Sequence, residues 1–377
     1  MATLYVTENG VQVHKQGQRL LVKKGPDIIQ DIPMIKVDRV VLMGKGASIT
    51  TPTLFALSSK KIGVFFLNSR GRYMLRTVGE EHNNSLLRMA QARISDDGDY
   101  TLRIARAIVN GKVNNQRVLV QRHAEGADWA RNALVQMDTM RKQVENAQTL
   151  DEVRGCEGLA AKNYFSLLRQ ILQPPRDGNT WGFDRRAYYP PSDPINAMLS
   201  FGYTLLLNDM IAACQISGLD PHLGFFHANN YNKPSLALDL AEEFRPVIVD
   251  SIVLTAVNRR LFCLNDFEAG RKNQSDDDDE EEETRNIGKN AVRGAVSGFS
   301  LTITSQKPTV ETPYPVYMKM EARRRFIQLY EMRVNEKVLH PSSGEQTAYR
   351  RVFELQAYAF SKMLLKETDR YTPFMIR

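Results

Sequence analysis

The chain has few cysteines and no long apolar run. Its 377 residues include only three cysteines, Cys156, Cys214 and Cys263, and no two of them form a CxxC pair. This spacing indicates neither a disulfide framework nor a zinc knuckle, and it fits a reducing, intracellular compartment. No apolar run approaches the ~18 to 20 residues of a bilayer-spanning helix. The N-terminus MATLYVTENG lacks the basic start and apolar core of a signal peptide, so we expect no membrane association.

Positive charge is in excess. The chain has 50 Lys and Arg residues against 43 Asp and Glu residues, a formal net charge of +7. One run, DDDDEEEE at residues 276–283, supplies eight of the acids, and the remainder has 50 basic against 35 acidic residues, or +15. A polyanionic partner is therefore plausible, although charge alone does not identify it as nucleic acid.

The order of the patterns predicts an α+β fold. Short, partly alternating segments separated by turns such as Asn9-Gly10 predict strands at 3–7, 11–15, 19–23, 39–43 and 63–68, with hairpins between the first three, and one small helix within 46–60. From about residue 83 the apolar residues recur at helical spacing. We expect a small β-rich N-terminal domain over 1–80 and a larger all-α C-terminal catalytic domain over 81–377, with an acidic inserted loop at about 269–313.

The densest set of candidate metal ligands lies in residues 221–247, PHLGFFHANNYNKPSLALDLAEEFRPV. His227 precedes a polar turn and then a helix on which Asp239, Glu242 and Glu243 share one stripe at about 100° per residue. Pro246 is expected to end this helix. An imidazole beside carboxylates suits Mn²⁺ or Mg²⁺ better than structural zinc. The alternative is a solvated acidic helix face with an ordinary histidine nearby.

A third candidate ligand, Glu157, lies in GCEGLAAKNYF at residues 155–165. Its glycine and alanine neighbours are small enough to let a ligand or another backbone come close. The alternative is a glutamate at the start of a helix, where it would interact favourably with the helix dipole.

The helices expected between residues 83 and 146 carry a basic side. Gly111 and Asn114-Asn115 are expected to interrupt them. This basic side is either a surface that binds the phosphates of a nucleic acid or an ordinary solvent-exposed helix face, and the sequence leaves both alternatives open. Its residues are Lys112, Arg117, Arg122, Arg131, Arg141 and Lys142.

Several segments, taken together and in order, resemble one known family. They read GCEGLAAKNYF, PPSDPINAMLSFGYTLL, LDPHLGFFH and SLALDLAEEFRPV, followed by YRRVFELQAYAFSKMLL and YTPFMIR near the end. The set resembles the CRISPR-associated integrase and endonuclease family, the first numbered family of CRISPR-associated proteins, and the resemblance covers nearly the whole chain.

The resemblance implies a divalent metal, Mn²⁺ or Mg²⁺, held by a glutamate, a histidine and a second acid. Matched motif by motif, these catalytic metal ligands are Glu157, His227 and Glu242. Many family members have Asp at the last position. Asp239 is then an auxiliary acid, and Glu243, one step further round the helix, is the less favoured ligand.

The resemblance also implies the activity and the partners. A DNA 3′-hydroxyl on the prespacer attacks a phosphodiester at the CRISPR repeat, and the same site cuts branched DNA when water attacks. The expected assembly is a homodimer formed mainly through the N-terminal domains. It works with the small second numbered CRISPR-associated protein in the cytoplasm of a prokaryotic cell.

Arginines in several segments are candidate DNA contacts. They lie in a tight turn, a proline-bracketed loop and two C-terminal helices. The set is Arg70, Arg72, Arg185, Arg186, Arg323, Arg324 and Arg350.

The acidic loop departs from the family pattern. A run of like charges predicts a solvated, mobile loop, and a sharper hypothesis is that the acids mimic DNA and cover the basic surface. Two other function classes stay open for the chain: a non-catalytic DNA-binding scaffold, and a metal-dependent phosphoesterase acting on small nucleotides.

Overall fold

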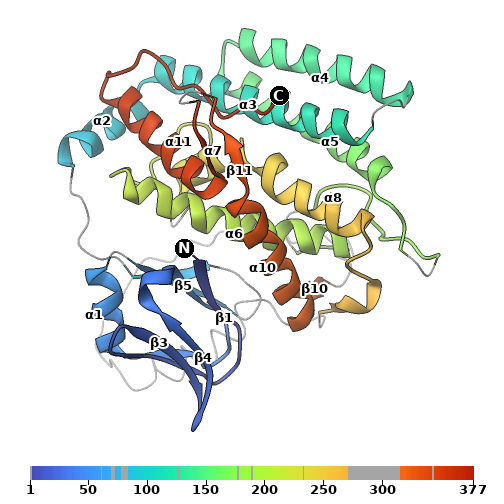
Figure 1. The fold of residues 1–377 in the computed structure, drawn as a ribbon. Helices are drawn as coiled ribbons and strands as arrows, with labels where there is room; N and C mark the ends of the chain where they lie inside the picture. Colours follow the sequence, from blue (N-terminus) through green and yellow to red (C-terminus); the bar gives the residue numbers. More distant parts are fainter. Residues whose placement is uncertain are drawn as a thin grey trace, which may run out of the picture.

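A computed structural model describes residues 2–60, 62–68, 73–77, 84–124, 128–175, 178–187, 190–231, 233–270, 315–341 and 344–377. Strands fill the N-terminal part and helices most of the remainder, which confirms the α+β class (Figure 1). The acidic run 276–283 and nearly all of the inserted loop lie outside the described residues. The domain boundaries at residue 80 stay a prediction.

The N-terminal part contains two four-stranded sheets. The first has the order β1-β5-β7-β8, in which β1, β5 and β7 are parallel and β8 is antiparallel to β7. The second has the order β4-β3-β2-β6, and its β2–β3 pair is the predicted hairpin. The strands are β1 Ala2–Val6, β2 Gln12–Gln16, β3 Arg19–Lys24, β4 Asp27–Pro33, β5 Val37–Leu42, β6 Ser48–Ile49, β7 Gly63–Leu67 and β8 Tyr73–Arg76.

The hairpin expected between β1 and β2 is wrong, because these strands belong to different sheets. The turn between them binds the segment after β5 instead: the Gly10 N–H donates to the Lys45 carbonyl at 2.9 Å. A Cβ on Gly44 would come within 1.9 Å of the Glu8 carbonyl oxygen, so this crossing requires glycine. The chain therefore passes from one sheet to the other at Asn9-Gly10 rather than folding back.

The first sheet is shared by two hydrophobic cores. Successive strand residues point to opposite faces, and Val40 and Val64 pack into the core of the N-terminal part. Val41 and Phe65, their sequence neighbours, pack into the large core of the helical part. This alternation joins the two parts of the molecule through one sheet.

Helices dominate the chain after β8 (Figure 1). Side-chain caps from Asp97, Thr149 and Asp193 begin the three longest helices, α3, α5 and α6. The helices are α1 Thr51–Ser59, α2 Ser85–Ser95, α3 Gly98–His123, α4 Asp128–Asn146, α5 Leu150–Ile171, α6 Pro194–Ile216, α7 Ser235–Ala241, α8 Ser251–Asn258, α10 Met320–Asn335 and α11 Tyr349–Leu364.

The region also contains short elements that the sequence did not indicate. Two antiparallel strand pairs, one π-helical turn and one 3₁₀ turn accompany the helices, so the C-terminal part is mainly rather than purely helical. The short elements are η1 Met34–Lys36 in the N-terminal part, η2 Pro246–Asp250, η3 Leu264–Asp266, β9 Phe267–Ala269, β10 Val316–Met318, β11 Lys337–Leu339 and β12 Gln346–Ala348.

Two predicted helix breaks are wrong. Helix α3 runs unbroken through Gly111 and Asn115, because both are buried against the C-terminal segment. A Cβ on Gly111 would lie 2.7 Å from Pro373 Cβ, and Asn115 donates to the Phe374 carbonyl at 2.8 Å. Pro246 does not end the helical path either. Helix α7 ends earlier, at Ala241, and Pro246 opens the π-helical turn η2, which leads into α8.

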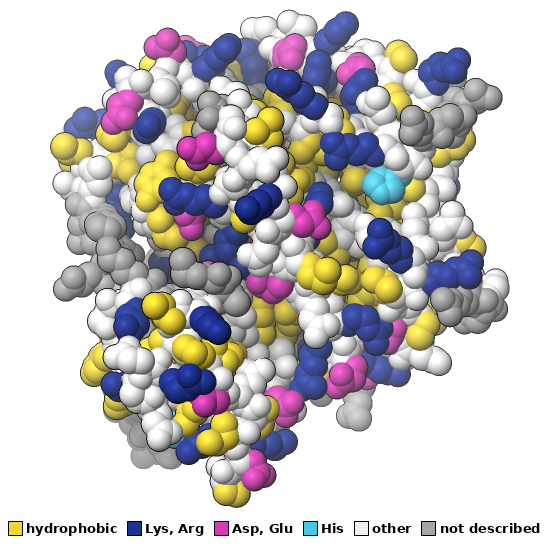
Figure 2. All heavy atoms as spheres, viewed as in Figure 1, with side chains coloured by type: hydrophobic (Ala, Val, Ile, Leu, Met, Phe, Trp, Pro, Cys, Tyr) yellow, Lys and Arg dark blue, Asp and Glu magenta, His cyan; other side chains and the backbone are white. Residues whose placement is uncertain are grey.

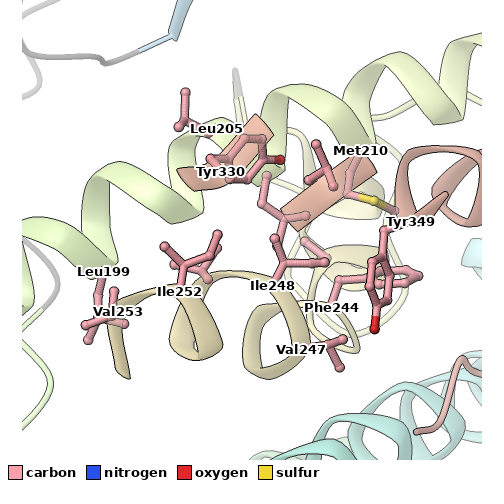
Figure 3. Close-up of a cluster of buried hydrophobic side chains, with 14 of the residues drawn as sticks. Leu199, Leu205, Met210, Phe244, Val247, Ile248, Ile252, Val253, Tyr330 and Tyr349 are labelled. Carbon is pink, nitrogen blue, oxygen red and sulfur yellow. The ribbon is translucent and has the colours of Figure 1, made fainter. Parts of the chain in front are cut away.

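Helix α6 forms the centre of the helical part. It is long and apolar enough to span a membrane by length and composition, which our sequence analysis did not anticipate, yet 78% of its most apolar window is buried. Leu199, Leu205 and Met210 on this helix lie among side chains from η2, α8 and α10 (Figure 3). The helix is therefore part of the hydrophobic core.

Candidate active site

The three predicted ligands come together from different elements of the helical part. Glu157 lies two turns inside α5, His227 lies in the loop between α6 and α7, and Glu242 follows the end of α7. Thr149 caps α5 by accepting the Glu152 N–H, so the alternative that Glu157 sits at a helix start is wrong. Packing of α3 against α5 brings the fourth contributor, Lys112, between them.

The loop that carries His227 is held from both sides. Gln91 on α2 is fully buried and donates to the carbonyls of Asp220 and Leu223 at 2.8 and 2.9 Å. On the other side, a Cβ on Gly224 would lie 2.5 Å from Ser235 Cβ, so the loop is pressed against the start of α7. These contacts fix the backbone that positions His227.

Asp239 orients His227. Its carboxylate accepts the backbone N–H groups of Phe225, Phe226 and His227 at 2.6, 3.0 and 2.9 Å. The same carboxylate lies 2.7 Å from His227 Nδ1. A carboxylate can only accept, so Nδ1 carries a proton, and Nε2 is the ring nitrogen left to face Glu242. Asp239 thus has the arrangement expected of an auxiliary acid behind a metal-binding histidine.

Glu242 lies at the centre of the site. It is only 2% exposed, which rules out the alternative of a solvated acidic helix face. Its Oε1 lies 3.6 Å from His227 Nε2 and 2.9 Å from Arg245 Nη1. Burial would raise the pKa of this carboxyl, but Arg245, Lys112 and His227 outweigh burial and lower the pKa to about 2. Glu242 is therefore an anion at physiological pH.

Lys112 bridges the two glutamates. Its ammonium forms an ion pair with Glu157 Oε1 and another, of 2.6 Å, with Glu242 Oε2. The latter oxygen has no donor in hydrogen-bond geometry. Burial would lower the pKa of Lys112, but Glu242 and Glu157 raise it above its ordinary value. The site thus holds one buried cation between the two carboxylates.

Glu243 points away from the site and holds the C-terminal segment. It accepts from Tyr371 OH at 2.5 Å and from the Phe374 N–H, while Asn115 donates to its backbone carbonyl at 2.7 Å. Burial raises the pKa of Glu243 to about 8, although Tyr371, Phe374 and Gln356 act in the opposite direction. The Glu243 carboxylate is therefore occupied by the C-terminal segment.

A second buried acid lies behind Arg245. Asp250 accepts from Tyr164 OH at 2.7 Å and Tyr203 OH at 2.6 Å. The Arg245 guanidinium lies 5.0 Å from the centre of the Tyr203 ring, and Arg186 lies on the same ring at 5.3 Å. A chain of contacts therefore runs from Glu242 through Arg245 and Tyr203 to Asp250.

The donors suit a hard divalent cation. Two carboxylates and one imidazole nitrogen are ligands that Mn²⁺ and Mg²⁺ accept, and an ammonium group already takes a cation's place between the carboxylates. In the part of the chain that the structure describes, no three His, Cys, Asp or Glu side chains lie close enough to form a ready metal site. The residues fit such a metal in their chemistry, and Lys112 must move to admit it.

Most of the predicted DNA-binding arginines make internal contacts. Arg350 is only 8% exposed and pairs with Glu331 at 2.7 and 3.0 Å, so the prediction that it contacts a phosphate is wrong. Arg323 donates to the Met318 carbonyl at 2.8 Å. Arg324 bonds to Thr7 and Glu8 at 3.0 and 2.9 Å, which ties α10 to the N-terminal part.

The remaining predicted arginines differ in availability. Arg185 is exposed, whereas Arg186 donates to Asn196 and Ser200 at 2.8 and 3.0 Å. Arg70 and Arg72 lie outside the described residues. Figure 2 shows Lys and Arg side chains spread over both parts of the molecule and mixed with Asp and Glu.

Our reading of the sequence missed the roles of Lys112 and Arg245. Lys112 appeared only as one basic residue of a helix side, and Arg245 was not assigned any role. A signal was present for Lys112, since GKVNNQ at residues 111–116 puts four polar residues into six consecutive positions and spreads them beyond one side of the helix. All six of these residues are buried.

Comparison with known proteins identifies relatives along the whole chain. Residues 4–283 match the family described as "CRISPR associated protein Cas1". A CRISPR-associated endonuclease Cas1 from Thermus thermophilus is 32% identical over 381 residues, which cover 100% of this chain and 98% of the relative.

Solved structures share the fold at lower identity. A casposase bound to integration product is 20% identical with a TM-score of 0.75, and the match covers 98% of this chain and 92% of that one. A chain of a Cas6-RT-Cas1–Cas2 complex is 21% identical with a TM-score of 0.72, over 99% of this chain and 36% of that one.

Proposed function

The chain belongs to the Cas1 family of CRISPR-associated proteins, and from this premise we propose that it is a metal-dependent DNA endonuclease and integrase of spacer acquisition. It joins the 3′-hydroxyl ends of prespacer DNA to the CRISPR repeat by phosphodiester transesterification. The same site cuts branched DNA when water replaces the 3′-hydroxyl.

The observation that carries this proposal is the meeting of Glu157 and Glu242 at one buried cation, with His227 beside Glu242. We propose that these three residues hold Mn²⁺ or Mg²⁺ once Lys112 withdraws. Such a metal supplies positive charge to the phosphoryl oxygens and makes an attacking oxygen more acidic. Asp239 holds the His227 ring so that Nε2, the nitrogen that would bind the metal, lies 3.6 Å from Glu242 Oε1.

The surface beside Glu157 is open to a bulky substrate. Gly155 and Gly158 are exposed, and a Cβ on either would meet no atom within 4 Å. Glycine within a helix costs ~1 kcal/mol relative to alanine, and no internal contact explains these two. A bare helix surface next to a metal ligand lets a DNA backbone approach closely. The exposed Arg185 is our candidate for a phosphate contact.

The proposed partners are DNA, a second copy of the chain and Cas2. The casposase neighbour is bound to integration product, and another neighbour is in a complex with Cas2. For the homodimer we propose the N-terminal part, where large apolar side chains are exposed. They are Ile28, Ile29, Ile35 and Phe55. We propose the prokaryotic cytoplasm as the location.

Strand transfer tests the proposal directly. A short duplex with free 3′-hydroxyls is incubated with a repeat-bearing plasmid and Cas2, in Mn²⁺ or in chelator, using the wild type and single alanine variants of Glu157, His227 and Glu242. Joining should require metal and should be lost in all three variants, while duplex binding is retained.

Two exposed residues near the site provide matched controls. Asp151 lies on the same helix as Glu157 with its side chain 89% exposed, and His222 lies in the same loop as His227. Alanine at either position should leave joining unchanged. If the wild type binds DNA but never joins or cuts it in any metal, the non-catalytic scaffold replaces the integrase.

A phosphoesterase for small nucleotides is less well supported. One cavity, of about 230 Å³, lies between α3 and the C-terminal segment and is lined by residues such as Tyr100, Arg103 and Tyr371. None of the three proposed metal ligands lines this cavity. Inhibition of joining by mononucleotides as strongly as by long DNA would favour the phosphoesterase.

A further inference from the structure

Lys112 is an unusual residue for its position. It lies in the middle of α3, is only 6% exposed, and its neighbours Gly111 and Val113 are buried as well. A lysine is almost never fully buried unless it is paired. Here it has two partners, and both are proposed metal ligands.

Two resident cations already offset most of the negative charge at the site. Glu157, Glu242 and Asp239 contribute three negative charges, and Lys112 and Arg245 contribute two positive charges. A divalent cation added to this set would leave one excess positive charge, with three cationic groups close together. Metal binding is therefore favoured when one of the resident cations gives up its contacts.

The geometry indicates which cation leaves. Arg245 pairs with Glu242 on Oε1, and its guanidinium lies on the Tyr203 ring. Lys112 contacts both glutamates and lies between Glu157 Oε1 and Glu242 Oε2, where a shared metal would have to bind. Lysine also has a flexible four-carbon stem and a compact charge that moves easily.

Building on the proposed function, we propose that Lys112 is a positioning residue that occupies the metal position as an internal counter-ion and is displaced when the metal binds. In the metal-free protein it holds the two glutamates together against their mutual repulsion. The same contacts compete with the metal, so the affinity of the site for Mn²⁺ is lower than its ligands alone would give.

The test is Mn²⁺ binding by the full-length protein, measured by calorimetry and by electron paramagnetic resonance. Lys112→Met keeps the length of the side chain and removes its charge, and it should bind Mn²⁺ at least several-fold more tightly than the wild type. Lys112→Arg keeps a positive charge and should bind no more tightly than the wild type.

Thermal unfolding provides a second readout. In EDTA, Lys112→Met should melt below the wild type, because Glu157 and Glu242 lose the cation between them. Mn²⁺ should raise the melting temperature of this variant more than that of the wild type. The control is Arg117→Met on α3, the helix that carries Lys112. It removes an ion pair with Asp138 of α4 and should respond to Mn²⁺ as the wild type does.

The outcomes separate this inference from the proposed function. If the wild type shows no Mn²⁺ or Mg²⁺ binding that is sensitive to Glu157→Ala, the proposed function itself fails. If the wild type binds Mn²⁺ but Lys112→Met binds equally or more weakly, the displacement is refuted. A structure of the wild type with Mn²⁺ bound tests the displacement directly, without a variant. Lys112 should then lie beyond ion-pair distance of at least one glutamate, and retention of both contacts would overturn the inference.

Discussion

Asp250 allows the electrostatics behind the candidate site to be measured as a stability change. Asp250→Asn preserves the size of the side chain and offers both Tyr164 and Tyr203 a hydrogen-bonding group, but it removes the titratable carboxyl. The carboxyl is 1% exposed. Burial raises its pKa from the ordinary value of 3.8 to about 6, although the two tyrosines, Arg186 and Arg245 oppose this shift.

The sign and the size of the effect follow from this shift. The pKa is raised in the folded protein, so the folded state holds the proton more tightly than the unfolded chain. The resulting stabilisation is present below pH 4 and is lost as the pH rises through about 6. A shift of about 2 pKa units corresponds to ~3 kcal/mol. The variant has no such proton, so the stability of the variant relative to the wild type should increase as the pH rises.

Melting temperatures of both proteins at pH 4 and pH 8 test this reasoning. For a chain of 377 residues, an unfolding entropy of ~0.8 kcal/mol/K converts the free-energy difference into a melting-temperature change. The variant should gain about 3 °C relative to the wild type between the two pH values, slightly less than the full effect because the unfolded carboxyl is partly ionised at pH 4. A difference that does not change with pH, or one that favours the wild type at pH 8, would refute it. Asp151→Asn, at an exposed position, should show no such trend.

Three further predictions concern packing, charge and the histidine. Gly202→Ala should destabilise the protein by ~1–3 kcal/mol, because the added Cβ would lie 2.4 Å from Val249 Cγ1. Gly158→Ala should instead raise the melting temperature, because a Cβ there meets no atom within 4 Å and alanine favours the helix. Arg350→Met removes a cation shared by Glu331 and the buried Asp209. It should destabilise the protein by less than the ~3–5 kcal/mol of a broken isolated buried pair, because Arg39 still pairs with Asp209, and it should leave the salt dependence of DNA binding unchanged. Arg185→Ala should lower by about one the slope of the logarithm of DNA affinity against the logarithm of salt concentration. It should leave the stability of the protein unchanged. Asp239→Asn should weaken Mn²⁺ binding ~10–100-fold, as measured by calorimetry.

Each of these predictions has a contradicting result. Equal melting temperatures for the two glycine variants would mean that helix packing at Gly202 is looser than the contacts indicate. A lower salt slope for Arg350→Met would show that this arginine reaches DNA after all. Unchanged Mn²⁺ affinity in Asp239→Asn would remove its role in orienting His227.

The ligand motifs were readable from the sequence because they are local. GFFH and SLALDLAEE place His227, Asp239 and Glu242 within 16 consecutive residues, and short-range contacts such as Asp239 with the loop backbone bring them together. The α+β order was readable for the same reason, since the apolar spacing changes from strand-like to helical along the chain. The grouping of His227, Asp239 and Glu242 therefore follows from segments close together in the sequence, whereas Glu157 joins them only through long-range packing.

Pairings between distant segments were not readable. Strand β1 pairs with β5 rather than with its neighbour, because the shared sheet must bury one face against each core. Gly111 looked like a helix breaker, yet it is the close approach of Pro373, more than 250 residues away, that requires glycine there. Arg350 looked like a surface phosphate contact, but Glu331 and Asp209 surround it.

The sequence by itself determined the type of chemistry: two carboxylates, an imidazole and an excess of basic residues, set in helices that follow a strand-rich start. Only the tertiary structure decided how the charges pair. Glu157, Lys112 and Glu242 lie on three separate elements, and their ion pairs exist because α3 and α5 pack together beside the end of α7. The energy of a buried charge depends on what lies within a few ångströms of it, and linear spacing carries no record of those neighbours.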